Sequence, residues 1–180
     1  MAATIILVLV GAYFVKDNLN DSKENAEPLL ASEQTPATQS EEGKGELFVL
    51  SAAEEQAYSS FKKDLDVRHL KDLGPINVAK LYVYAAYVQD TEVVYALYTD
   101  REDRIQWSME EDKNIPAADR GTREQIAAQY KNLEKGIFVK TSDFEGYIEF
   151  ESSKNSGVKS GFQMIQNEGG IWQVAFMPIQ

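Results

Sequence analysis

The stretch that decides the fold runs from Gly74 to Val88 and reads GPINVAKLYVYAAYV. Proline is well tolerated in the first turn of a helix and poorly tolerated later, so Gly74-Pro75 predicts a helix start. The residues that follow at helical spacing are Val78, Leu81, Tyr82 and Ala85. The segment is apolar on more than one side, which predicts a helix that is largely buried.

Two capping boxes predict helices on either side of this segment. In a capping box, a Ser or Thr side chain and a Glu or Gln three residues later satisfy each other's free backbone N–H groups. Ser51–Glu54 matches this pattern and predicts a helix to about Lys63. Thr122–Gln125 matches it again, and Gly136 is placed to end that second helix in a left-handed conformation.

The sequence between these boxes predicts a short helix and a strand. Asp90 and Thr91 offer a cap for the helix. The residues that would share one face of it are Val94, Leu97 and Tyr98. Apolar and polar residues then alternate as in a half-buried strand, with the apolar positions at Ile105, Trp107 and Met109.

After Gly136 the sequence is typical of strands separated by turns. Short apolar and alternating runs cover 137–140, 146–151, 158–165 and 171–177. The turn residues lie at 153–157 and 167–170. Short turns require antiparallel neighbours, so this half is expected to be a meander. Helices packed on one face of an antiparallel sheet make an α+β domain, here expected over residues 47–180.

The N-terminal segment, residues 1–16, is interpreted as a membrane anchor or signal-like segment. Ala2 to Val15 reads AATIILVLVGAYFV and carries no charge. As a helix it would reach about 21 Å, short of the roughly 30 Å hydrocarbon core of a bilayer. The anchor residues are Ile5, Ile6, Leu7, Val8, Leu9, Val10 and Phe14.

A cleaved signal would need a basic region before the apolar run and small residues after it, and neither is present. The hypothesis is therefore an uncleaved anchor, with the N-terminus inside and the C-terminus outside, whose real start lies upstream. A stop codon directly before Met1, with no alternative start, would refute it. The alternative is a buried N-terminal helix or strand of a soluble domain.

Residues 17–46 are expected to form a disordered acidic linker. They hold eight acidic residues against two lysines, and Leu19, Leu29 and Leu30 are their only large aliphatic residues. Such a segment cannot bury enough apolar surface to fold. Self-repulsion would keep it extended and hold a folded domain clear of a membrane.

Composition excludes several classes of function. The formal net charge is -11 and the sequence pI is about 4.6, which argues against a nucleic-acid partner because neutralising phosphates requires clustered Lys and Arg. The chain has no cysteine, which removes disulfides, thiolate nucleophiles and thiolate metal sites.

Candidate catalytic groups are few. His69 is the only histidine and lies among charged residues, so we interpret it as an exposed connector rather than a general base. Acidic clusters at 100–103 and 110–112 lack the register of a calcium loop and are interpreted as solvated faces. No catalytic, cofactor-binding or metal-binding residue is therefore predicted.

The order of helices, strand, helix and strand meander, which ends in GIWQVAF (170–176), resembles the nuclear transport factor two-like, or cystatin-like, superfamily. VAKLY (78–82), DTE (90–92) and ALYT (96–99) are similar to the opening helices of that fold. The chain also looks similar to single-anchor extracytoplasmic proteins of Gram-positive bacteria, some described as sigma-factor regulators. The resemblance implies a curved sheet around a helix, a pocket at the wide end of the cone and an outer sheet face used for dimerisation.

The isomerases and dehydratases of that superfamily use an Asp, or an Asp and a His, with Tyr donors inside the cone. No carboxylate can be placed in the apolar interior from the sequence, so core packing is the favoured role for the tyrosines. The candidate pocket or partner surface consists of Tyr82, Tyr98, Trp107 and Trp172.

The predicted function is a non-enzymatic, membrane-tethered regulatory or interaction module in the cell membrane. Its C-terminal domain would lie outside the cytoplasm and contact an envelope protein or another copy of itself. One alternative is a small-molecule-binding or isomerase-like domain that uses the cone pocket. Another is a regulator that acts through membrane-embedded contacts of Ala2–Val15.

Overall fold

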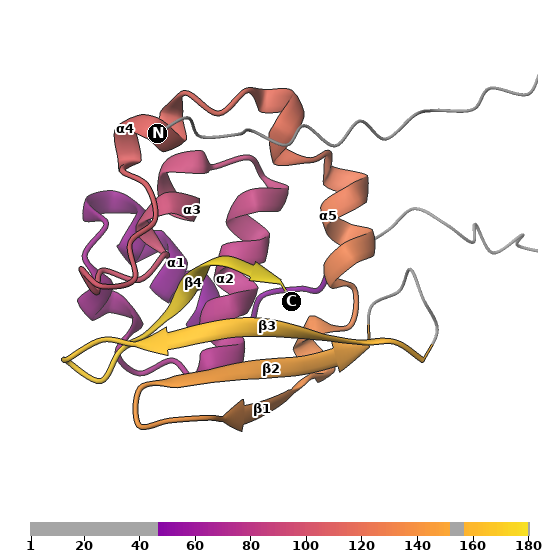
Figure 1. Ribbon diagram of the computed structural model, residues 1–180. Coiled ribbons are helices and arrows are strands. Elements are labelled where there is room, and N and C mark those ends of the chain that lie inside the picture. The colour runs from indigo at the N-terminus through magenta and orange to yellow at the C-terminus, as the bar shows by residue number, and fades with distance from the viewer. Residues whose placement is uncertain (1–46, 152–156, 180) are drawn as a thin grey trace, which may run out of the picture. The chain divides into compact units, whose positions relative to one another are not determined.

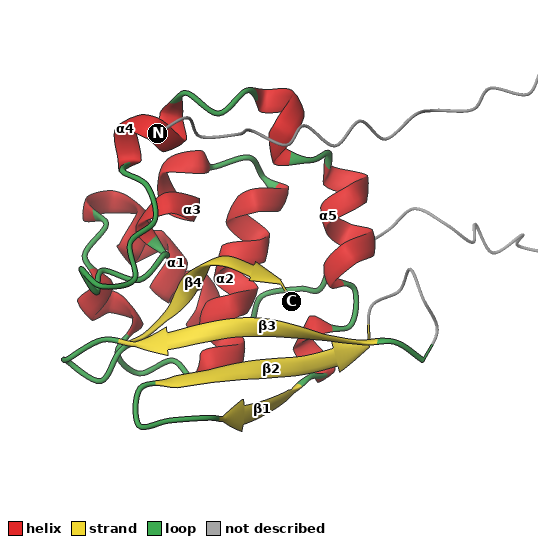
Figure 2. Cartoon of the chain, viewed as in Figure 1, coloured by secondary structure: helices red, strands yellow, loops and turns green. Residues whose placement is uncertain are grey.

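The computed structural model describes residues 47–151 and 157–179, in which helices precede a four-stranded antiparallel sheet. The helices lie on one side of the sheet (Figures 1 and 2), which confirms the predicted α+β class. In chain order the elements are α1 (Ala52–Asp64), the 3-10 helix η1 (Val67–Leu70), α2 (Pro75–Tyr87), α3 (Thr91–Ala96), α4 (Met109–Lys113), η2 (Ala117–Arg120), α5 (Arg123–Tyr130), η3 (Leu133–Lys135), β1 (Ile137–Lys140), β2 (Glu145–Glu151), β3 (Lys159–Gln166) and β4 (Trp172–Ile179).

The predicted membrane anchor, residues 1–16, and the predicted linker, residues 17–46, lie outside the described residues. Within 47–151 and 157–179, no helix combines the length and the apolar character needed to cross a bilayer. The anchor and the linker therefore stay predictions.

Both predicted capping boxes are confirmed. The Ser51 hydroxyl accepts a hydrogen bond from the Glu54 N–H at 3.3 Å, and the Glu54 carboxylate accepts one from the Ser51 N–H at 2.7 Å. Thr122 and Gln125 make the equivalent pair at 3.3 and 2.8 Å. These local bonds satisfy N–H groups that lack helical partners, and α1 and α5 begin directly after them.

The predicted burial of α2 is confirmed. Helix α2 contacts α1, α3 and α5 and also β3 and β4. Its buried residues are Val78, Ala79, Leu81, Tyr82, Val83 and Ala85. Because these residues face several directions around the helix axis, α2 needs neighbours on several sides.

The predicted meander is confirmed, with strand order β1-β2-β3-β4 and every neighbouring pair antiparallel. Ile148 of β2 lies opposite Phe162 of β3, and both are fully buried against the helices. Val174 and Phe176 of β4 are buried, and Trp172 packs partly buried against the core. The sheet thus supplies one wall of the core.

The predicted strand at Ile105–Met109 is wrong. Ser108 and Glu111 form a third capping box, with the Ser108 N–H donating to the Glu111 carboxylate at 2.7 Å, and α4 begins at Met109. Ile105 is 45% exposed, so its alternation with polar neighbours does not reflect a half-buried strand. A strand needs a partner strand, whereas a capping box forms from neighbouring residues alone.

The predicted left-handed end at Gly136 is also wrong. Helix α5 ends at Tyr130, and Gly136 follows η3 with φ -66°. A Cβ at Gly136 would lie 2.5 Å from Cγ2 of Ile148. Glycine is therefore needed here for the close approach of the chain to β2, and not for a left-handed turn.

Asp90 occupies the position before α3, but its side chain makes no capping bond. Its carboxylate instead accepts a hydrogen bond from the Tyr58 hydroxyl at 3.3 Å and pairs with the Lys62 ammonium group. The predicted side-chain cap at Asp90 is therefore wrong. Tertiary partners on α1 hold this carboxylate and join α1 to the start of α3.

The buried carboxylate of Glu54 joins α1 to α2. It accepts hydrogen bonds from Asn77 Nδ2 at 2.8 Å, Lys80 Nζ at 2.6 Å and the Ser51 N–H at 2.7 Å. Burial by itself would raise the pKa of Glu54, but these bonds outweigh it and hold the pKa below its ordinary value of 4.5. The stabilisation is therefore complete above the ordinary pKa and is lost as the pH falls through the lowered one.

The Gly146→Ala substitution tests how closely β2 packs on β1. A Cβ at Gly146 would lie 2.4 Å from Cζ of Phe138 and 2.7 Å from the Val139 carbonyl oxygen. Phe138 can rotate, but that carbonyl belongs to the paired backbone of β1 and cannot retreat without disturbing the ladder. We expect Gly146→Ala to lower the free energy of unfolding by about 2 kcal/mol in urea denaturation.

The matched control is Gly161→Ala in the neighbouring strand. There the nearest atom to a new Cβ is 3.5 Å away, which is ordinary van der Waals contact. An equal loss of stability in the two variants would contradict the steric explanation.

Candidate functional site

A cavity of about 490 Å³ lies between α2, α3 and the segment 107–121, which contains α4 and η2. This volume falls within the roughly 300–1,000 Å³ of small-molecule sites. Helices α2 and α3 and their flanking turns contribute Tyr82, Ala86, Gln89, Thr91, Val94 and Tyr98. The segment 107–121 contributes Trp107, Asp112, Lys113, Ile115, Ala117, Asp119, Arg120 and Gly121.

The turn at Gln89 brings α2 and α3 to the same side of the cavity. Gln89 has φ 61°, a left-handed conformation that costs a non-glycine residue roughly 1–2 kcal/mol. Backbone hydrogen bonds hold the turn, from the Gln89 N–H to the Ala86 carbonyl at 3.0 Å and from the Asp90 N–H to the Ala85 carbonyl at 2.9 Å. The strained residue therefore lies at the border of the cavity, with its side chain lining it.

A pair of tyrosine hydroxyls lies on the inner wall. The Tyr82 and Tyr98 hydroxyl oxygens are 2.8 Å apart, and their rings are in contact at 5.4 Å between centroids. Burial raises the pKa of both hydroxyls above the ordinary value of 10.0. Both groups are therefore neutral at physiological pH and can donate and accept hydrogen bonds.

Asp112 is the buried carboxylate of the site. One oxygen accepts a hydrogen bond from Trp107 Nε1 at 3.2 Å, and the other accepts one from Arg120 Nη2 at 2.9 Å. Arg120 also donates to the Asp112 backbone carbonyl. Asp112 therefore joins the two ends of the segment 107–120, and each of its carboxylate oxygens accepts one hydrogen bond.

Aromatic contacts attach this segment to the domain. The Trp107 ring packs edge-to-face against Tyr98 at 5.8 Å and Phe176 at 4.6 Å between centroids. Tyr98 and Phe176 stack at 4.5 Å with an interplanar angle of 16°. The Tyr95 hydroxyl donates to the Trp107 carbonyl oxygen at 2.9 Å. The wall formed by Trp107 is thus anchored to α3 and to β4.

Three of the four residues singled out from the sequence meet at this cavity. Tyr82, Tyr98 and Trp107 line it together. Trp172 is not among its lining residues and packs against Phe138 of β1, with 4.9 Å between ring centroids. The pocket and the sheet surface around Trp172 are therefore two separate places.

The interpretation of residues 110–112 as a solvated acidic face is wrong at Asp112. Glu110 and Glu111 are exposed, but Asp112 is 4% exposed. From the sequence no carboxylate could be placed in the interior, and the structure shows that the Asp112 carboxylate is buried. The Ser108–Glu111 capping box was a missed signal for helix α4, but a capping box does not indicate which side of the helix is buried.

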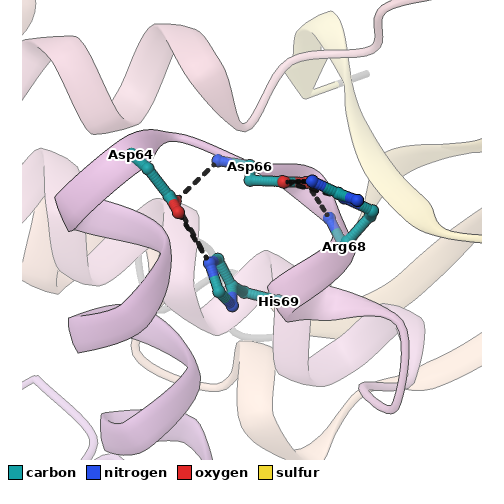
Figure 3. Close-up of polar contacts among 4 residues, drawn as sticks. All are labelled: Asp64, Asp66, Arg68 and His69. Atoms are coloured by element: carbon teal, nitrogen blue, oxygen red, sulfur yellow. Dashed lines mark hydrogen bonds and ion pairs between the residues drawn. The ribbon is translucent and has the colours of Figure 1, made fainter.

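The prediction that His69 is an exposed connector residue is confirmed. Its Nε2 lies 3.1 Å from both carboxylate oxygens of Asp64. Figure 3 shows the His69 ring facing this carboxylate. The hydrogen bond with His69 lowers the pKa of Asp64. In the same chain segment, where α1 leads into η1, Asp66 pairs with the Arg68 guanidinium, which holds the pKa of Asp66 at about 2. These exposed pairs contribute little to stability, and none of the four residues lines the cavity.

In the part of the chain that the structure describes, no group of three or more His, Cys, Asp or Glu side chains is arranged to hold a metal ion. Searches against protein-family models, curated proteins and solved structures found no match to this chain. The geometry of the cavity is therefore the starting point for its function.

The Asp112–Arg120 pair is tested by a double-mutant cycle. Asp112→Ala leaves Trp107 Nε1 without an acceptor and removes the charge partner of the partly buried Arg120, which keeps only its bond to the backbone carbonyl of residue 112, so we expect a loss of about 2–3 kcal/mol in the free energy of unfolding. Because Arg120→Ala removes the unpaired charge, the double variant should be more stable than the sum of the two losses predicts, with a coupling of about 1–2 kcal/mol.

Asp119→Ala is the control for this cycle. Asp119 also lines the cavity but is exposed at its border, and its removal should change stability by less than about 0.5 kcal/mol. Additive losses in the Asp112–Arg120 cycle would show that the pair does not hold the segment.

Proposed function

We propose that residues 47–180 form a non-enzymatic binding domain that takes a small organic molecule in the cavity between α2, α3 and the segment 107–121. The observation that carries the proposal is a single cavity wall that combines the Tyr82–Tyr98 hydroxyl pair, the Trp107 ring and apolar side chains. Small-molecule sites have this composition, with a few placed polar groups on an apolar lining.

The hydrogen bonds of Asp112 favour binding over catalysis. A general base needs a carboxylate oxygen that can accept a proton from a substrate. Both oxygens of Asp112 already accept hydrogen bonds, from Trp107 and Arg120, and its charge is compensated by the Arg120 guanidinium. Asp112 thus acts as a structural group that shapes the wall. This argument weighs against the isomerase-like alternative.

The cystatin-like form and the membrane tether are further parts of the proposal. Helices that precede an antiparallel meander support the cone-like form. The apolar run at residues 1–16 and the acidic stretch at 17–46 support a single membrane anchor with a spacer, and hence a domain outside the cytoplasm. In this arrangement the domain is a regulatory module in a bacterial envelope.

A second role, contact with an envelope protein or another copy of the chain, is favoured by the sheet. No helix among the described residues covers the second face of the sheet (Figure 1). Tyr147 and Gln163, opposite each other on β2 and β3, lie on that face and are partly exposed. A sheet face of this kind can accept a partner surface.

The cavity is tested by NMR on the full chain with 15N-labelled tryptophan. Trp107 lines the cavity and Trp172 does not, so their two indole N–H resonances supply a reporter and an internal reference. Trp172→Phe identifies the two signals. We expect members of a library of small organic fragments to shift the Trp107 resonance saturably and to leave the Trp172 resonance in place.

Two alanines of η2 supply matched variants for this experiment. Both Ala117 and Ala118 are exposed, but only Ala117 lines the cavity. Ala117→Phe should abolish the shifts by filling the cavity, and Ala118→Phe should preserve them. If no fragment produces a saturable shift that Ala117→Phe removes, the cavity is not a binding site.

The tether and the partner are tested together in a bacterial host. The full chain should sediment with membranes and resist alkaline extraction, whereas residues 17–180 should not.

Cross-linking through a photoreactive residue at position 147 should capture an envelope protein or a second copy, and the same probe at the exposed position 118 should not. Recovery of the full chain in the cytosol would overturn the tether, and equal cross-linking at both positions would overturn the use of the sheet face.

A further inference from the structure

The charges inside the cavity compensate each other. Two ionised side chains reach its wall away from solvent, Asp112 with 5% and Arg120 with 21% of the side chain exposed, and they form an ion pair at 2.9 Å. The second Asp112 oxygen is taken by Trp107 Nε1. At the border, exposed Lys113 and Asp119 add one charge of each sign. The cavity therefore offers no uncompensated charge to an ionic ligand.

Either kind of ion would meet a specific penalty here. An anion would share Arg120 with the Asp112 carboxylate and would lie beside that negative charge. A cation would compete with Arg120 for Asp112 and would lie beside the guanidinium. Disturbing a buried ion pair in this way leaves a charge without full compensation, which is costly. The arrangement selects for uncharged molecules.

The tyrosine pair has one unused donor. A hydrogen bond between two hydroxyls uses one hydrogen and leaves the other free. Across residues 47–151 and 157–179, neither the Tyr82 nor the Tyr98 hydroxyl has a second hydrogen-bond partner. A donor that is largely removed from water without an acceptor is unfavourable, so a ligand oxygen that accepts this hydrogen would be stabilised.

Beside its polar residues, which include Gln89 and Thr91, the lining presents apolar and aromatic surface. Trp107 and Tyr98 contribute rings, and Ala86, Val94 and Ile115 contribute aliphatic surface. Aromatic side chains pack favourably against flat rings in offset or edge-to-face arrangements. A volume of about 490 Å³ accommodates a molecule of one or two rings.

From these three features we propose that the ligand of this cavity is an uncharged molecule of one or two rings with a carbonyl or amide oxygen that accepts the free hydrogen of the Tyr82–Tyr98 pair. The inference rests on the proposed binding function and assigns its ligand class. Tyr98 and Tyr82 are the specificity-determining residues for the oxygen, and the Asp112–Arg120 pair excludes charged analogues.

Three probes with the same ring system test the ligand class. They are 2-naphthamide, which is neutral and carries a carbonyl oxygen, 2-naphthoate, which is an anion, and 2-naphthylmethylamine, which is a cation at neutral pH. Each is titrated into the full chain while the Trp107 and Trp172 indole resonances are followed. We expect 2-naphthamide to shift the Trp107 resonance with a Kd about tenfold or more below those of the two charged probes.

A tyrosine variant tests the hydrogen bond. Tyr98→Phe keeps the ring that stacks on Phe176 and removes the hydroxyl, so we expect about fivefold weaker binding of 2-naphthamide. Tyr87→Phe is the matched control, because Tyr87 also belongs to the α2 region but does not line the cavity, and it should leave the Kd unchanged. An unshifted Trp172 resonance in each variant reports an intact fold.

The outcomes separate this inference from the proposed function. Tighter binding of 2-naphthoate or 2-naphthylmethylamine at the Trp107 resonance would overturn the uncharged ligand class and leave the cavity a binding site. An unchanged Kd in both Tyr98→Phe and Tyr82→Phe would overturn the hydroxyl contact. If none of the three probes shifts Trp107 although other fragments do so and are blocked by Ala117→Phe, the ligand class is wrong and the binding function stands.

Discussion

The burial of α2 on several sides is the constraint on which the rest of the structure depends. Its apolar residues point in more directions than one neighbouring layer could cover. The sheet covers one side through β3 and β4, and α1, α3 and α5 cover the others. The cavity lies between α2, α3 and the segment 107–121. The packing around α2 therefore also decides where a ligand could bind.

The two buried carboxylates, Glu54 and Asp112, have different structural roles. Glu54 accepts hydrogen bonds from Asn77 and Lys80 and thereby joins α1 to α2. Asp112 accepts from Trp107 and Arg120, which belong to its own stretch of chain. Buried charges persist only when they are paired and hydrogen-bonded. The first pair therefore connects elements of the core, and the second shapes one wall of the cavity and neutralises it.

The local structure of the segment 101–121 was not predicted correctly from its sequence pattern. Its alternation of apolar and polar residues predicted a strand, yet residues 105–109 pair with none of the four strands of the described sheet. Ser108 and Glu111 carried a correct local signal, because a capping box needs only neighbouring residues. The burial of Asp112 had no such signal of its own. Its partners Trp107 and Arg120 are close in sequence, but the apolar surroundings come from α3 and β4.

The sequence by itself determined the α+β class, the starts of α1, α2 and α5 and the antiparallel meander. Capping, proline placement and alternation act between residues a few positions apart, so they can be read along the chain. Only the tertiary structure decided the cavity. Tyr82 and Tyr98 are 16 residues apart and meet because α2 and α3 pack together. Trp107 and Asp112 reach the cavity because the Trp107 indole ring packs against Tyr98 and Phe176. Contacts of this kind depend on the packing of whole elements, which no local pattern records.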